Sequence, residues 1–333
     1  MRLFSFWLLV VSCKGCQACV NPSIPHDDDG DDSASPDSAE TGDSTAPIDT
    51  SPEPECVFQE VEPNDWSPGG GGDPPTIIEM EKWACGDVTG IGDNDHLQVT
   101  ADGAVEWIRF DVVAGAEGSS LDANLLVPDS DYGAAVEDSD VNSVFTEDSN
   151  DPVLCFPLLA TPHTFDLVLA DADWLSGEDN YHWKLRARSV KAPVSWTLEE
   201  VEPNDPGLGG PPQHLGIADR VFAYLPSAVD VDAYTFDVPL VGENQSVRVA
   251  IDVDAYRFGS PALTEITVKD PTGDVLVEGY RHDEFDRKAD PYYEVKEPVP
   301  GTYEVYVNLH EGTGSDAFWY VLGAHVEVVD APK

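Results

Sequence analysis

The residues best suited to chemistry form a short run of acidic and amide side chains that occurs twice. Glu60-Val61-Glu62-Pro63-Asn64-Asp65 returns unchanged as Glu200-Val201-Glu202-Pro203-Asn204-Asp205, a shift of 200 − 60 = 140 residues. In an extended Glu-x-Glu, both carboxylates lie on one side of the chain, about 7 Å apart. The proline favours extended geometry in the residue before it, and Asn-Asp suits a turn that brings further oxygens back towards the glutamates.

Oxygen donors gathered in this way repel one another unless a cation lies among them. Calcium takes six to eight oxygen ligands in flexible geometry, so it is the ion that such a cluster fits. A second interpretation remains open, in which the hexapeptide only forms a turn at the entrance to each folded module.

Two later motifs complete the pattern in the second copy: Asp230-Val231-Asp232-Ala233-Tyr234-Thr235-Phe236 and Gly301-Thr302-Tyr303. Together with the hexapeptide they resemble the bacterial pre-peptidase C-terminal (PPC) family, which forms jelly-roll-like β-sandwiches in exported proteins and includes the collagen-binding modules of clostridial collagenases. The resemblance implies calcium ligands in the second copy at Glu200, Glu202, Asn204, Asp205, Asp230 and Asp232. By the same match it implies Glu60, Glu62, Asn64 and Asp65 in the first copy, where Ala104, Glu106 and Ile108 stand in for Asp230, Asp232 and Tyr234 and leave a full site in doubt.

The elements that must position these residues are strands. Val247, Val249, Ile251 and Val253 alternate with polar or small residues, and Tyr303, Val305, Val307 and Leu309 do the same, which is the period of a half-buried strand. The repeat continues beyond the hexapeptide, and we match Trp107–Val112 with Ala233–Val238, Thr164–Leu169 with Thr302–Val307, and Tyr181–Leu185 with Phe318–Leu322. We therefore predict an all-β protein with two tandem antiparallel β-sandwiches, at residues 56–192 and 193–333.

The N-terminal segment reads as an export signal. Arg2 precedes a short apolar run from Leu3 to Val11, which is too short to span a bilayer. Val10-Val11-Ser12-Cys13 resembles the bacterial lipobox, so we predict a signal peptide at 1–12 and a lipid anchor at Cys13; an ordinary or uncleaved signal is the alternative. No Asp follows Cys13, which favours the outer membrane or cell surface of a Gram-negative bacterium.

Residues 13–55 are predicted to form a disordered acidic tether, because from Val20 to Glu55 they are rich in Asp, Ser, Pro and Thr and carry no Lys or Arg. The formal net charge of −47 argues against nucleic-acid binding, since phosphate contacts need Lys and Arg. Export permits disulfides. Among Cys56, Cys85 and Cys155 we favour the Cys56–Cys85 pair, with Cys85–Cys155 as the second choice.

The sequence carries no motif of a catalytic site: there is no Gly-x-Ser-x-Gly, no His-Glu-x-x-His and no phosphate-binding loop. We expect a non-catalytic surface lipoprotein that binds or adheres to an extracellular protein or polysaccharide through calcium-stabilised modules. The main alternative is a structural spacer or envelope-assembly protein with no ligand beyond calcium. A hydrolase that uses clustered carboxylates is the remote alternative.

Overall fold

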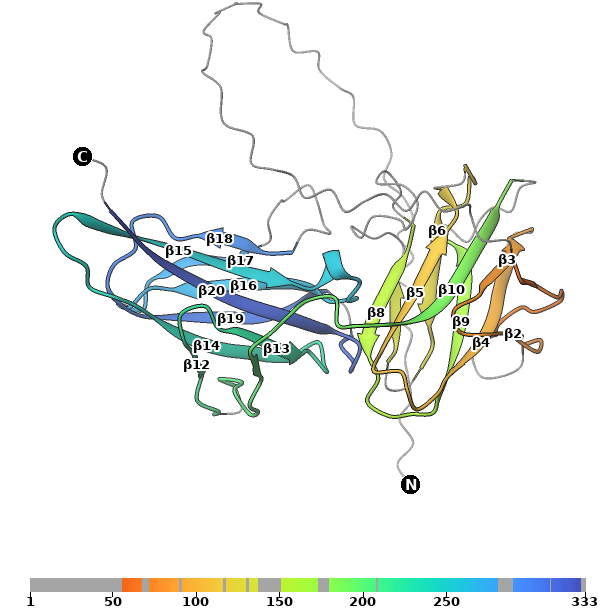
Figure 1. Ribbon diagram of the computed structural model, residues 1–333, viewed down its shortest axis with the longest axis horizontal. Helices are drawn as coiled ribbons and strands as arrows, with labels where there is room; N and C mark the ends of the chain where they lie inside the picture. The colour runs from red at the N-terminus through yellow and green to blue at the C-terminus, as the bar shows by residue number, and fades with distance from the viewer. Residues whose placement is uncertain are drawn as a thin grey trace, which may run out of the picture. The chain divides into compact units, whose positions relative to one another are not determined.

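The computed structural model describes ten stretches of the chain: residues 56–67, 72–89, 92–115, 118–129, 132–136, 151–172, 180–207, 209–280, 290–311 and 313–330. Cys13 and the predicted tether up to residue 55 lie outside them. Residues Ile48–Lys333 form one compact unit, and the regular elements of its described part are strands, apart from one short 3-10 helix (Figure 1). In these stretches no helix has the length and apolar character needed to cross a membrane.

The first sandwich consists of two five-stranded sheets. One sheet has the order β1 (Phe58–Gln59), β3 (Trp83–Asp87), β10 (His182–Val190), β5 (Trp107–Val113), β8 (Val153–Pro157). The facing sheet has the order β2 (Thr76–Ile78), β4 (Asn94–Ala101), β9 (His163–Asp171), β6 (Ala123–Val127), β7 (Ala134–Val136). Alternate residues of β4, β6 and β10 are buried, whereas every residue of β8 is buried, and the buried faces of the two sheets pack against each other.

The second sandwich repeats this plan strand for strand. Its first sheet has the order β11 (Leu198–Glu199), β13 (Arg220–Tyr224), β20 (Trp319–Asp330), β15 (Gln245–Asp254), β18 (Tyr292–Glu294). Its second sheet has the order β12 (Gln213–Leu215), β14 (Val231–Val238), β19 (Gly301–Glu311), β16 (Leu263–Lys269), β17 (Val275–Tyr280). A short 3-10 helix, Tyr256–Phe258, follows β15. The prediction of two β-sandwiches is confirmed.

The sheets are mixed, although we expected them to be antiparallel. β1 runs parallel to β3 and β2 runs parallel to β4, and the second sandwich has the same two parallel pairs. The hexapeptide follows β1 directly and brings the chain across to the opposite sheet, where the amide of His96 in β4 donates a hydrogen bond to the carbonyl oxygen of Asn64. Each edge strand is only two or three residues long, so the hexapeptide fills the crossing between the layers.

One predicted match between the repeats is wrong. Trp107–Val113 is β5, and it occupies the place of β15 rather than that of β14. The counterpart of β14 is β4, because Thr76 pairs with Leu97 just as Gln213 pairs with Tyr234. The shift is therefore 234 − 97 = 137 residues, which aligns Asp95 with Asp232. The identical tripeptide Phe-Asp-Val in β5 and β14 favoured the wrong match, but the place of a strand is set by its distant partners.

Aromatic and aliphatic side chains fill the space between the sheets of each sandwich. In the first, Phe110 of β5 meets Phe165 of β9 at a ring distance of 5.5 Å, and both side chains are fully buried. In the second, the hydroxyl groups of Tyr234 and Tyr320 lie 2.8 Å apart across the layers. Burial of each such ring contributes about 2 kcal/mol or more.

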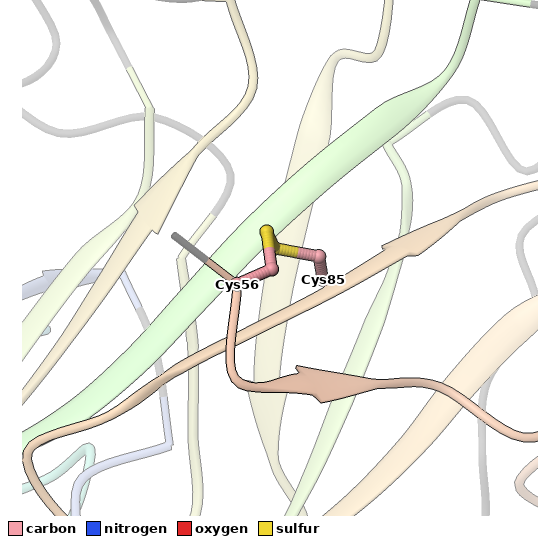
Figure 2. The surroundings of a disulfide bond; sticks show 2 residues. All are labelled: Cys56 and Cys85. Carbon is pink, nitrogen blue, oxygen red and sulfur yellow. A yellow bond between two sulfur atoms is a disulfide. The ribbon is translucent and has the colours of Figure 1, made fainter. Parts of the chain in front are cut away.

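A disulfide joins Cys56 to Cys85, which is the pairing favoured from the sequence (Figure 2). Cys155 is a free, buried thiol. The bond fastens the chain just before β1 onto β3. The positions equivalent to Cys56 and Cys85 in the second sandwich are Trp196 and Phe222, whose rings stack at 4.6 Å. The same strand pair is thus held by a covalent bond in one module and by an aromatic stack in the other.

Four aromatic residues, Trp107, Trp196, Phe222 and Trp319, form a cluster that we call the aromatic junction. Trp107 opens β5 of the first sandwich, and its ring lies 5.2 Å from that of Trp319 and 5.9 Å from that of Phe222. The Trp319 indole N–H also donates a 2.6 Å hydrogen bond to the carbonyl oxygen of Cys155. The two modules therefore share apolar and polar contacts within the one compact unit.

Candidate metal centres

Backbone hydrogen bonds fix the first hexapeptide to opposite sheets at its two ends, and they fix the second hexapeptide at its start. The amide of Glu60 donates to the carbonyl oxygen of Cys85 in β3 at 2.9 Å, and the carbonyl oxygen of Asn64 accepts from the amide of His96 in β4 at 3.1 Å. In the second module the amide of Glu200 donates to Phe222 in the same way, at 2.9 Å. The side chains between these anchors therefore face a gap between two layers.

In the first module three carboxylates converge. Glu60, Glu62 and Asp95 each place one carboxylate oxygen within 4.8 Å of the others. Each also accepts a hydrogen bond that fixes its orientation: Glu60 from the amide of Asp87 at 2.7 Å, Glu62 from the amide of Asn64 at 3.1 Å, and Asp95 from the indole of Trp183. Glu62 is exposed, whereas Asp95 is completely buried.

The second module has the same arrangement at Glu200, Glu202 and Asp232, again within 4.8 Å. Glu202 accepts a hydrogen bond from the amide of Asn204 at 2.9 Å, as Glu62 does from that of Asn64. The carboxylate of Glu200 is held by side chains, whereas that of Glu60 is held by a backbone amide. Glu200 accepts from the Tyr234 hydroxyl at 2.8 Å and from the Asn204 side-chain amide at 2.7 Å. Asp232 accepts from the Tyr320 hydroxyl at 2.5 Å.

Several buried oxygens at these clusters have no hydrogen-bond partner among the described residues. They are Oδ1 of Asn64, Oδ1 of Asp95 and Oε2 of Glu60 in the first module, and Oδ1 of Asn204, Oδ1 of Asp232 and Oδ2 of Asp230 in the second. A buried polar atom left without a partner costs about 1–3 kcal/mol. All six atoms are oxygens, and in their unprotonated form they are acceptors that a hard cation would satisfy.

The pKa values of the converging carboxyls are raised because the groups are desolvated and lie beside one another. Burial, followed by the neighbouring glutamate, raises the pKa of Asp95 to about 10 and that of Asp232 to about 10. Burial raises the pKa of Glu60 to about 7 and raises that of Glu200 as well. Without a cation, such a site keeps protons on its carboxyls; a cation would take the place of those protons.

The structure separates the residues of the predicted ligand set into two groups. Glu60 and Glu62 belong to the converging group of the first module, and Glu200, Glu202 and Asp232 to that of the second. Asn64 and Asn204 are hydrogen-bonded beside these groups. Asp65 is exposed and its Oδ1 lies 3.5 Å from the amide of Asn94, and Asp205 accepts a 2.5 Å bond from the amide of Gly207. Neither belongs to the converging group. Asp230 borders it, and burial followed by the charges of Glu202 and Asp205 raises its pKa to about 6.

Sequence reasoning missed Asp95. It assigned the corresponding positions to Ala104, Glu106 and Ile108, which is corrected by the alignment of β4 with β14. A signal was present, since Asp93-Asn94-Asp95 opens an alternating strand just as Asp230-Val231-Asp232 does. The first module therefore has its own buried aspartate, and the doubt about that site rested on the wrong strand.

The side chains behind each cluster differ in a compensating way. Trp183 and Gly86 of the first module correspond to Tyr320 and Ala223 of the second, because each pair is adjacent in register. A methyl group on Gly86 would overlap the Glu60 carboxylate and the Trp183 ring. Glycine at position 86 therefore leaves room for the indole of Trp183, which is larger than the phenol of Tyr320. In both modules one aromatic side chain donates a hydrogen bond to the buried aspartate.

Comparisons with known proteins add little to this geometry. No protein-family model matches the sequence, and no curated protein matches it. Among solved structures, the chain is similar to the pre-peptidase C-terminal domain of collagenase from Bacillus anthracis, with 18% identity, 38% of this chain and 100% of that chain covered, and a TM-score of 0.25.

Two larger proteins are similar over more of the chain. One is the M60 catalytic domain with two CBM51 domains from Clostridium perfringens, with 8% identity, 76% of this chain and 34% of that chain covered, and a TM-score of 0.22. The other is tripeptidyl peptidase 2, with 12% identity, 75% and 24% covered, and a TM-score of 0.25. TM-scores of this size do not support a functional assignment. The functional argument therefore depends on the residues of this chain.

Proposed function

We propose that the chain is an exported, lipid-anchored, non-catalytic surface protein with two PPC-like modules. Each module binds one calcium ion, through Glu60, Glu62, Asn64 and Asp95 in the first and Glu200, Glu202, Asn204 and Asp232 in the second. The modules bind or adhere to an extracellular protein or polysaccharide, at the outer membrane or cell surface. In this proposal calcium supplies positive charge and oxygen coordination, and it does no chemistry on a substrate.

The observation that carries the calcium proposal is the recurrence of the same unsatisfied oxygens in both modules. Asn64 and Asn204 each use the backbone amide for a hydrogen bond to a glutamate, and each leaves a buried Oδ1 without a partner. Asp95 and Asp232 each use Oδ2 for an aromatic donor and leave a buried Oδ1. The two copies of the repeat keep one donor set although the side chains behind it differ, which supports a shared ligand over chance burial.

Calcium at these positions would fasten the two layers of each sandwich together, since Glu60 is anchored on β3 whereas Asp95 belongs to β4. An ion that binds only the folded state stabilises it by about 2.7 kcal/mol per site at a concentration one hundred times its dissociation constant. A chelator is therefore expected to lower the melting temperature of the full chain, and calcium to restore it.

Two isosteric substitutions test whether the stabilisation comes from these clusters. Asp95→Asn and Asp232→Asn each remove one charge while keeping the side-chain shape, and each should abolish about half of the calcium-dependent shift in melting temperature. Asp102→Asn, which changes an exposed carboxylate just beyond the other end of β4, is the matched control and should keep the whole shift. Equal calcium-dependent shifts in melting temperature in all three variants would show that calcium does not bind at these clusters.

The anchor proposal rests on the run that ends at Cys13 and on the charge of the chain. A net charge of −47 disfavours direct contact with an anionic membrane surface, so attachment would depend on the lipid. We expect Cys13→Ser to move the protein from the membrane fraction to the soluble fraction of cells, as measured by immunoblotting after fractionation. Retention of the variant in the membrane fraction would contradict lipid anchoring.

A structural spacer is the second candidate, and the distribution of aromatic residues favours it. Within the described stretches, Trp83, Trp107, Trp183 and Trp319 are buried, and Tyr293 packs against Tyr280 at 5.5 Å. Tyr292, at 38% exposure, is the most exposed of the described large aromatics. A spacer would bind no extracellular polymer in a calcium-containing screen, whereas the proposed binding protein would retain at least one.

A further inference from the structure

A groove with a volume of about 620 Å³ lies at the start of β15 in the second module. Its walls combine apolar residues, among them Leu240, Val247 and Val249, with charged residues at Arg248, Glu294 and Glu297. Leu240 is 85% exposed, which is unusual for a leucine beside a concave surface and indicates an apolar contact yet to be made.

Beside this groove the backbone of β15 has an open edge. β18 pairs with β15 from Ala250 to Asp252, and the amide of Val295 adds a bond of 3.0 Å to the carbonyl oxygen of Val249. Before Val249, the described residues pair with β15 only on its β20 side. Because alternate residues of an antiparallel strand direct their N–H and C=O groups to the same side, those of Val247 face the open edge, as the carbonyl group of Val249 does.

The first module closes the equivalent position with its own chain. Lys184 pairs with Val113 and Val321 pairs with Asp254, so the shift between β5 and β15 is 254 − 113 = 141 residues and Glu106 corresponds to Val247. The carbonyl oxygen of Glu106 accepts a 2.9 Å bond from the amide of Leu158, just after the five-residue β8. β18 has only three residues, and no described residue after Val295 pairs with β15 on this edge.

The backbone groups at the open edge of β15 and the side chains of the groove determine which ligand can bind there. A strand edge with a free N–H and C=O pairs with another extended backbone. The apolar floor at Val247 and Val249 receives one aliphatic side chain of that backbone, while Glu294 and Glu297 outnumber Arg248 on the walls. Because the chain has a net charge of −47, it attracts a basic segment of another protein. It disfavours the binding of its own acidic segments at the groove.

We propose that this groove binds an extended, basic polypeptide segment of a partner protein, which continues the sheet beside β15 where β18 ends. The segment alternates aliphatic and Lys or Arg residues, so that the aliphatic side chains enter the groove. This inference names a partner class for the binding function proposed above and rests on it. It does not involve the calcium clusters, so the melting experiment and the test of the groove can fail separately.

The test uses the full chain in saturating calcium and a fluorescently labelled, end-blocked peptide of alternating lysine and valine, with binding followed by anisotropy. Binding should be lost when the peptide amides on one edge are N-methylated, because that removes the donors needed for strand pairing and keeps the charge. Glu294→Lys should weaken binding about tenfold. Glu278→Lys makes the same charge change on the exposed edge strand β17 and should leave binding unchanged.

Hydrogen exchange measured with and without the peptide shows where it binds, and protection is expected at Val247 and its neighbours. Three results would overturn the proposal: no binding of the lysine-valine peptide, equal binding of its N-methylated form, or equal weakening by Glu294→Lys and Glu278→Lys. Self-association of the chain that protects the same edge, without competition from the peptide, would assign the position to a second copy and overturn it too.

Discussion

Asp95 and Asp232 each accept a hydrogen bond from an aromatic donor on the facing sheet, Trp183 in one module and Tyr320 in the other. A fully buried carboxyl beside a glutamate is stable in one of two forms, protonated or bound to a cation. The aromatic donor satisfies one oxygen in either form. The second oxygen, which lacks a partner, is the atom whose environment differs between the two states.

The fall of stability with rising pH should therefore be removed when calcium is added. Burial raises the pKa of Asp95 and Asp232 to about 10 from an ordinary 3.8, so between these values the calcium-free folded state holds more protons than the unfolded chain. Its free energy of unfolding must then fall as pH rises. With saturating calcium the bound carboxylates hold no protons, as in the unfolded chain, so the free energy of unfolding should stay nearly constant between about pH 5 and about pH 8. Denaturant titrations at both pH values check this; the same slope with and without calcium would contradict it.

Gly86 offers a test confined to one module, because a methyl group there would overlap both Glu60 and Trp183. We expect Gly86→Ala to weaken calcium binding at the first site about tenfold or more through displacement of these groups, while the second site keeps its affinity. Ala223→Gly changes the equivalent position by the same methyl group in the opposite sense. It should leave both affinities unchanged, as read by calcium titration calorimetry, and a loss at the second site in Gly86→Ala would contradict the local account.

At the scale of elements, β1 leads directly into Glu60 and Glu62, and the Cys56–Cys85 disulfide holds it. The bond closes a sequence separation of 29 residues, so its loss is expected to cost about 3 kcal/mol. Replacing both cysteines by serine should destabilise the first module and weaken its calcium site, because the ligand-bearing edge strand is released from β3. The second module, held by Trp196 and Phe222, should bind calcium as before. Thiol reduction of the natural chain should give the same result in a calcium titration, and equal weakening of both sites would contradict it.

Sequence alternation was sufficient to predict the long strands. β15 and β19 appear where Val249, Ile251, Val305 and Val307 alternate, and these side chains are buried. The two-residue β1 and β11 carry no such period, so the parallel edge pairing could not be predicted. The match of β5 with β14 failed because a tripeptide of local likeness outweighed pairings that only the fold reveals. Asp95 was missed for that reason, although the glutamates and asparagines of the site were not.

At the scale of the whole molecule, the aromatic junction links the modules through Trp107. The amide of Cys155 also donates a 2.7 Å bond to the carbonyl oxygen of Gly259.

A junction of this kind should make the two sandwiches unfold together. Trp107→Ala should cost about 3–5 kcal/mol and divide the single calorimetric transition into two. Trp83→Ala removes a buried indole outside the junction and should lower stability while keeping one transition. Two transitions in the natural chain would show that the junction does not couple the modules.

The most direct test of the account is the number of calcium ions that one chain binds, measured by titration calorimetry of the metal-stripped protein. The account predicts two ions per chain, one ion after either Asp95→Asn or Asp232→Asn, and none at these sites when both substitutions are combined. A stoichiometry that is zero in the natural chain, or that stays at two in the double variant, would contradict it.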